Sequence, residues 1–162
     1  MKKRQWLIPL AGLFFLGTLS GCNQSQDPKG AEAPSAAVTA PVLLRQPAPS
    51  GAEVYFITPE NGATVSNPIA VQFGLRNMGV APAGVAHPDT GHHHLLVDTE
   101  LAQLDFPVPA DDQHLHFGGG QTQTSITLAP GTHTLQLVLG DYLHIPHDPP
   151  VTSARITITV TE

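Results

Sequence analysis

The chain has 162 residues, of which 41% are hydrophobic and 12% charged, a length that suits one domain with an appendage. It carries 7 Lys and Arg against 13 Asp and Glu, a formal net charge of −6, and three of the cations occupy positions 2–4. We therefore expect no binding to nucleic acid, because that requires Lys and Arg to neutralise phosphates. The single cysteine excludes an intrachain disulfide, a cysteine-type zinc site and an iron–sulfur cluster.

The N-terminal 21 residues have the layout of an export signal. Positions 2–4 are cationic and residues 7–19 are almost wholly apolar, which is too short for the ~20 residues that cross a bilayer as a helix. The sequence Leu19-Ser20-Gly21-Cys22 resembles the bacterial lipobox, in which the cysteine is lipidated after cleavage. Residues 1–21 are thus predicted to be a lipoprotein signal peptide, although an ordinary signal with a coincidental cysteine is the alternative.

This resemblance predicts where the protein resides. Two or three acyl chains on Cys22 would anchor it stably to a membrane, where one chain would not. We expect an exported protein at the periplasmic face, and Asn23 favours the outer membrane if the host is Gram-negative. Residues 22–50, rich in proline and alanine, are predicted to form a disordered tether because they cannot bury enough apolar surface to fold.

From residue 51 to residue 162 the pattern changes to alternation with a period of two, which is typical of strands. No segment has a helical period over three turns. The expected strands begin near Glu53, Ile69, His92, Gln121, Leu135 and Ile156, with turn signals between them. The predicted fold is an all-β, Ig-like Greek-key sandwich of two sheets, with a small β-barrel as the alternative.

All nine histidines lie between positions 87 and 147, and six of them form closely spaced pairs. Side chains two apart on a strand project to the same face, so the pairs in His92-His93-His94 and His114-Leu115-His116 each present two imidazoles together. His144 and His147 flank a short proline-containing loop. Imidazoles from adjacent strands are close enough to share one ion, and this donor set suits Cu(II), Zn(II) or Ni(II). The predicted ligands are His92, His94, His114, His116, His144 and His147.

Several carboxylates could support these ligands, since a ligating histidine commonly donates its other N–H to an acidic group. We assign this role to Asp98, Asp112 and Asp148. The alternative for all the pairs is structural hydrogen bonding without a metal. His93 is expected to point away from its neighbours, and His133 to be a half-buried packing residue.

The segment from Val54 to Val160 resembles a bacterial family of exported domains of unknown function, number 4399. The resemblance rests on the stretches Asn77-Met78-Gly79-Val80, Gly91-His92-His93-His94-Leu95-Leu96-Val97-Asp98, His114-Leu115-His116-Phe117-Gly118-Gly119-Gly120-Gln121-Thr122 and Pro146-His147-Asp148-Pro149-Pro150. It implies an exported domain that commonly stands alone behind a signal sequence. It implies no reaction, substrate or catalytic residue.

Four functions are compatible with these patterns. The first is a cell-envelope lipoprotein that binds a transition metal as a buffer, chaperone or sensor. The second is a non-catalytic adhesion or assembly module that contacts an envelope protein or wall polymer, with structural histidines. A metal-dependent hydrolase is less favoured because no His-Glu-x-x-His motif is present, so the sequence leans away from an enzyme. A response to pH through the histidines is the fourth.

Overall fold

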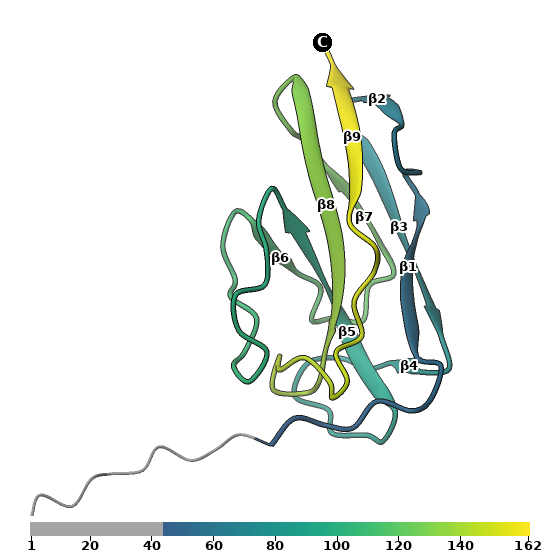
Figure 1. The fold of residues 1–162 in the computed structure, drawn as a ribbon, viewed down its shortest axis with the longest axis vertical. Coiled ribbons are helices and arrows are strands. Elements are labelled where there is room, and N and C mark those ends of the chain that lie inside the picture. Colours follow the sequence, from purple (N-terminus) through teal and green to yellow (C-terminus); the bar gives the residue numbers. More distant parts are fainter. Residues whose placement is uncertain (1–43) are drawn as a thin grey trace, which may run out of the picture. The chain divides into compact units, whose positions relative to one another are not determined.

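The structure is a computed structural model that describes residues 44–162. These residues fold into nine strands arranged in two sheets (Figure 1). The strands are β1 (Glu53–Thr58), β2 (Thr64–Ser66), β3 (Ile69–Arg76), β4 (Gly79–Val80), β5 (Thr90–Val97), β6 (His114–His116), β7 (Gln123–Ile126), β8 (Gly131–Gly140) and β9 (Ile156–Thr161). Over this part of the chain no helix has the length and apolar character that a membrane crossing requires.

The smaller sheet has the order β1-β3-β7 and is antiparallel throughout. Its central strand, β3, alternates strictly between buried and exposed residues from Ile69 to Phe73. Ile69, Val71 and Phe73 turn inward, while Ala70 and Gln72 face solvent. This period of two is the pattern from which the strand was predicted.

The larger sheet has the order β2-β9-β8-β5-β4, and β6 pairs with β5 on the edge opposite β8. It is mixed, because β2 runs parallel to β9 and β4 runs parallel to β5, and it curls into a half-barrel. The parallel pair at β2 follows the Asn61-Gly62 turn, where Thr157 N–H donates to Asn61 Oδ1 at 2.8 Å and Gly62 N–H donates to the Thr157 carbonyl at 2.7 Å. The all-β class and the two sheets are confirmed, whereas neither parallel pairing was predicted.

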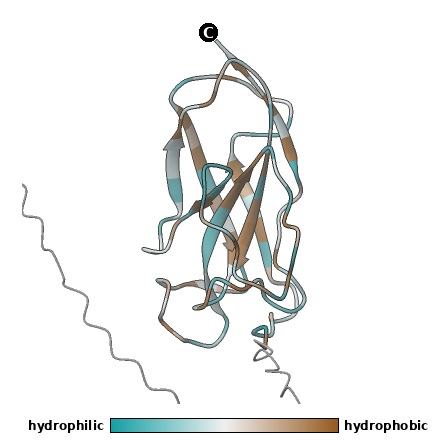
Figure 2. Cartoon of the chain, turned by 90° about the vertical axis from the view of Figure 1, so that its left-hand side faces the viewer, coloured by the Kyte–Doolittle hydropathy of each residue, from teal (hydrophilic) through white to brown (hydrophobic). Residues whose placement is uncertain are grey.

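The main core fills the space between the sheets. Its fully buried members come from both sheets and include Val71, Leu95, Leu137 and Ile158. Hydrophobic residues are concentrated along the strands that enclose this core (Figure 2). A smaller apolar cluster of Leu96, Val108 and Val138 lies elsewhere on the large sheet.

Strand β5 is buried on both faces, since every residue from Gly91 to Val97 is buried. His93, Leu95 and Val97 belong to the face that packs against the small sheet, as the contact of His93 with the Phe73 ring shows. His92, His94 and Leu96 occupy the opposite face, because side chains alternate along a strand. The loops around β6 and after β8 cover this second face, which holds the candidate site.

The N-terminal border of the folded domain differs from the predicted one. Residues 44–50 were assigned to the tether, yet Ala48 N–H donates to the Asp148 carbonyl at 2.9 Å and Asp148 N–H donates to the Gln46 carbonyl at 2.8 Å. Arg45 also donates to the backbone carbonyls of Pro146 and His147. These segments pair because each offers the other free backbone groups, which composition alone does not reveal. The predicted signal peptide, Cys22 and the first part of the tether lie outside the described residues.

Candidate metal centre

Strand β5 supplies two imidazoles on one face. His92 and His94 are two residues apart, and both are almost completely buried. Opposite them on β8 lies Gly140, whose register partner is His92. A Cβ atom on Gly140 would lie 2.9 Å from His94 Nε2, so glycine at this position makes room for the His94 ring.

Strand β6 supplies the third imidazole. It pairs antiparallel to β5 with His116 opposite His94, which brings these two rings to a centroid separation of 5.1 Å. The next loop begins at Gly118, where a Cβ atom would lie 2.5 Å from His116 Nε2. The first glycine of the Gly118-Gly119-Gly120 run therefore accommodates the His116 ring.

The fourth imidazole, His144, comes from the loop between β8 and β9. The buried carboxylate of Asp141 holds this loop, because its Oδ1 accepts hydrogen bonds from Leu143 N–H at 2.8 Å and Ile145 N–H at 3.0 Å. His144 N–H donates to the Asp141 carbonyl at 2.9 Å. His144 has a φ of +68°, a left-handed conformation that is uncommon for a residue with a side chain and concentrates at functional sites.

The four rings converge on one point. One nitrogen of each of His92, His94, His116 and His144 lies within 4.8 Å of the corresponding nitrogen of every other. His92 Nε2 is 3.0 Å from His144 Nδ1 and 3.1 Å from His94 Nε2. Since metal–nitrogen bonds are ~2.0 Å long, small movements of the rings would let all four nitrogens bind a single ion.

The surroundings of three of the four rings disfavour their protonation. Burial, together with the neighbouring imidazoles, lowers the pKa of His92 to about 4 and the pKa of His94 to about 2. Burial and His144 also lower the pKa of His116. These rings are therefore neutral near pH 7, as metal ligation requires. The Nδ1 atoms of His92 and His94 are buried without a hydrogen-bond partner, so packing and the Nε2 contacts orient the two rings.

Two of the predicted ligands lie outside this group. His114 shares the face of His116, but the register of β6 places it opposite Leu96, and its Nδ1 is 2.8 Å from Asp111 Oδ1. His147 is buried elsewhere, with its Nδ1 3.3 Å from the Leu139 carbonyl and its Nε2 3.2 Å from the Thr90 carbonyl. The sequence did not distinguish these two from the four that converge.

The predicted supporting carboxylates have other contacts. Asp98 accepts hydrogen bonds from His133 and from Thr134 N–H, at 2.6 and 2.7 Å. Asp148 forms an ion pair with Arg45 at 3.7 Å, and Asp112 is exposed beside the turn that Asp111 organises. The acidic residue that does support the site is Asp141, through the backbone of the His144 loop. The sequence signal that could have identified Asp141 is its position directly after β8 and three residues before His144.

His93 lies in the core, as its alternation predicted. Its ring packs against Phe73 at a centroid distance of 5.0 Å, and neither ring nitrogen has a hydrogen-bond partner. Burial lowers the pKa of His93 to about 4, so the ring is neutral there. It is a packing residue on the face of β5 opposite the four-histidine group.

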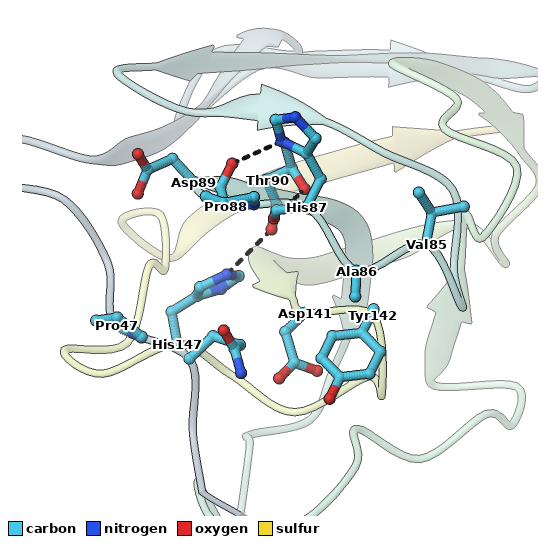
Figure 3. Close-up of a pocket in the computed structure, with 11 residues that line it drawn as sticks. Pro47, Val85, Ala86, His87, Pro88, Asp89, Thr90, Asp141, Tyr142 and His147 are labelled. Atoms are coloured by element: carbon cyan, nitrogen blue, oxygen red, sulfur yellow. Dashed lines mark hydrogen bonds between the residues drawn. The ribbon is translucent and has the colours of Figure 1, made fainter.

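A pocket of about 290 Å³ lies next to the His144 loop and shares Asp141 with it (Figure 3). Its wall includes Val85, Thr90, Tyr142 and His147. Figure 3 shows the hydrogen bond between the His147 ring and the Thr90 carbonyl, and the Asp141 carboxylate between His147 and Tyr142. None of the four convergent histidines lines it, so this pocket is separate from the candidate metal centre.

Fold and site together define an all-β domain of two sheets, with four histidines on and beside the larger sheet that could hold a metal ion. The family model described as "Domain of unknown function (DUF4399)" matches residues 71–161, which include all four histidines, and the chain belongs to this family. The family resemblance found in the sequence is thus confirmed. No curated protein and no solved structure matches the chain.

Proposed function

We propose that this domain binds one transition-metal ion through His92, His94, His116 and His144, and that it acts in the cell envelope as a metal buffer, chaperone or sensor. The observation that carries the proposal is the convergence of four ring nitrogens, from β5, β6 and the β8–β9 loop, within 4.8 Å of one another. Three separate chain segments contribute to this convergence, which chance packing of isolated histidines does not readily produce.

The cost of assembling the group supports the same conclusion. Two imidazoles are buried with unpartnered Nδ1 atoms, and a third is held in a left-handed backbone conformation. An unsatisfied buried polar group costs about 1–3 kcal/mol, and a residue in a sparsely populated backbone conformation costs a similar amount. An ion bound at the Nε2 atoms gives the Nδ1 atoms no partner, but its binding free energy stabilises the folded state as a whole and would offset the cost of assembling the group.

The test is metal binding by protein purified without a histidine tag and stripped with a chelator. Elemental analysis should find one Cu, Zn or Ni per chain after loading. A hundred-fold excess of metal over Kd should stabilise the fold by about 2.7 kcal/mol, visible as a rise in Tm. The double variant His92→Ala/His94→Ala should lose the ion, while His87→Ala, in an exposed loop outside the group, should retain it. Equal metal content in the two variants would refute the proposal.

We further propose that the domain is exported and is attached to the periplasmic side of a membrane by lipid on Cys22. The cationic and apolar N-terminal segment followed by the lipobox-like sequence supports this location. Cell fractionation tests it: wild-type protein should sediment with membranes, and Cys22→Ser should appear in the soluble periplasmic or culture fraction. Membrane retention of the serine variant would argue against the anchor.

A further inference from the structure

Asp141 uses only one of its two carboxylate oxygens to hold the His144 loop. Its Oδ1 accepts hydrogen bonds from Leu143 N–H and Ile145 N–H, whereas its Oδ2 is buried without a hydrogen-bond partner. Asp141 is 1% exposed, and within residues 44–162 no ion pair includes it. A buried carboxylate oxygen without a partner destabilises a fold, so a group that donates a hydrogen bond to Oδ2 would bind favourably.

The pocket of about 290 Å³ beside the His144 loop has Asp141 in its wall (Figure 3). Because this residue lines the pocket and is nevertheless almost fully buried, it lies at the inner end. Its carboxylate is placed there between the side chains of His147 and Tyr142. The volume is close to the lower end of the ~300–1,000 Å³ range typical of ligand sites, so the pocket suits a small organic molecule.

The charges on the pocket wall favour a cation. The eleven lining residues include two carboxylates, Asp89 and Asp141, and no lysine or arginine. Arg45, which precedes the lining segment Gln46-Pro47, donates instead to backbone carbonyls and pairs with the exposed carboxylate of Asp148. The Asp141 carboxylate therefore has no cationic partner from this arginine.

The two histidines of the wall are directed at backbone carbonyls and not at Asp141. His147 Nδ1 is 3.3 Å from the Leu139 carbonyl, and its Nε2 is 3.2 Å from the Thr90 carbonyl. His87 Nδ1 is 2.9 Å from the carbonyl of the next residue, and Thr90 Oγ1 donates to the His87 carbonyl at 2.9 Å. These contacts fix both rings, so this side of the pocket is already formed, as is usual for ligand sites.

The rest of the wall is largely apolar and consists of Pro47, Val85, Ala86, Pro88 and the ring of Tyr142. An aromatic ring attracts a cation that lies over its face within ~6 Å. Metal ions such as Ca²⁺ need six to eight oxygen ligands, whereas this inner end offers one unpartnered carboxylate oxygen. An organic ammonium ion with a small apolar body fits both the charge and the apolar wall.

A ligand must displace part of the wall to reach Asp141 Oδ2, because neighbouring atoms cover this oxygen. Gln46 is the one lining residue with a long unbranched side chain, and it is exposed. Since the rings of His87 and His147 are held by hydrogen bonds, we expect the Gln46 side chain to be the part that moves.

We propose that this pocket binds a small organic ammonium ion. Asp141 Oδ2 accepts a hydrogen bond from the ammonium group, and Tyr142 and Val85 contact the apolar body. The site is separate from the four-histidine group and does not depend on metal binding.

The experiment is an NMR titration of the chelator-stripped chain at constant ionic strength, so that no metal ion competes for the amine. The probes are benzylamine, an ammonium ion at neutral pH, and its neutral analogue benzyl alcohol. Benzylamine should shift the backbone amide signals of residues 85–90 and 141–142. It should bind about 10- to 100-fold more tightly than benzyl alcohol, the factor expected of one hydrogen bond between charged groups.

Three variants locate the bound amine. Asp141→Asn keeps the shape of the side chain and removes its charge, so it should bring the two probes to equal affinity. Asp112→Asn makes the same change of charge at an exposed position outside the pocket and should leave the preference for benzylamine intact. Ala86→Phe places a ring in the pocket and leaves Asp141 unaltered, and it should abolish the shifts at residues 141–142.

The proposal fails if the two probes bind the wild-type chain equally, if the shifts lie outside the pocket, or if Asp141→Asn retains the preference for benzylamine. Ala86→Phe keeps the test decisive where Asp141→Asn disturbs the His144 loop, because unchanged benzylamine binding in this variant would also place the ligand elsewhere. None of these outcomes bears on the four histidines, whose metal content is measured separately.

Discussion

Replacing Gly118 with alanine tests the metal site without altering any of its ligands. The new Cβ atom would lie 2.5 Å from His116 Nε2, whereas non-bonded atoms separate to about 3.5–4.0 Å. The His116 ring must therefore move by about 1 Å, several times the ~0.2 Å tolerance of a metal–ligand bond length. Because mutating the groups that orient a metal ligand typically costs 10–100-fold in affinity, we expect Gly118→Ala to weaken metal binding by about 10-fold or more.

The neighbouring residue provides a matched control. A Cβ atom on Gly119 would approach only the flexible side chain of Gln121, at 3.1 Å, and neither Gly118 nor Gly119 has a left-handed φ. His116 is exposed and free to move, but the new Cβ atom at Gly118 would also lie 3.2 Å from Ala83 Cβ, so we expect Gly118→Ala to lower the unfolding free energy of the metal-free domain by about 1 kcal/mol or less. Titration of each variant against a chelator of known affinity gives the comparison. Equal affinities of Gly118→Ala and Gly119→Ala would show that His116 is not a ligand.

Three further substitutions test the structure around the site. Asp141→Ala leaves two backbone N–H groups of the His144 loop unpaired, which should lower the unfolding free energy by about 1–3 kcal/mol and weaken metal binding. Asp141→Asn keeps an acceptor oxygen and should restore most of the stability and most of the metal affinity. Wild-type metal affinity in the alanine variant would contradict this role of Asp141. His93→Leu removes two buried unpartnered nitrogens, so Tm should stay equal or rise and metal content should not change; loss of the ion would place His93 in the site. The Asp98 carboxylate raises the pKa of His133 through a hydrogen bond, and this stabilisation is complete below the ordinary pKa of 6.5 and is lost as pH rises through the higher folded value. His133→Gln should therefore destabilise the domain by less than about 1 kcal/mol at pH 5–6 and less still at pH 8, and a penalty that grows with pH in denaturant unfolding would refute the assignment.

The part of the site on β5 could be predicted because a strand has a fixed side-chain period. His92 and His94 share a face in any strand that contains both, whatever its partners. The side-chain period alone could not predict that His116 lies close to these two residues, because this also depends on the register between β5 and β6. A register displaced by two residues would have placed His114 opposite His94 and His116 opposite His92, and so changed which imidazoles converge. Register is determined by the long 98–113 connection and by packing, so the sequence could name both histidines but not choose between them.

The loop ligand was less predictable for a related reason. His144 and His147 are both near the end of β8, and no periodicity applies in a loop. Two hydrogen bonds to Asp141 and a left-handed backbone turn His144 toward β5, while His147 reaches backbone carbonyls of β5 and β8 instead. Local carboxylate–backbone contacts of this kind are visible only once the loop has closed, so the sequence presented the two residues as equivalent.

The run His92-His93-His94 places imidazoles on both faces of β5. Alternation sends the middle ring into the apolar core and its neighbours to the opposite face. That opposite face must be covered, because two neutral imidazoles and Leu96 are buried there. The cover consists of β6, the glycine-rich turn after it and the β8–β9 loop, and two of these segments contribute the remaining histidines. If this face only had to be buried, apolar side chains would cover it at the lowest free-energy cost, because burying a polar group without a hydrogen-bond partner destabilises the fold. The covering segments contribute imidazoles instead. Gly118 leaves room for the ring of His116, and Gly140 at the end of β8 leaves room for the ring of His94, so we interpret this second core as a candidate binding site and not as packing alone.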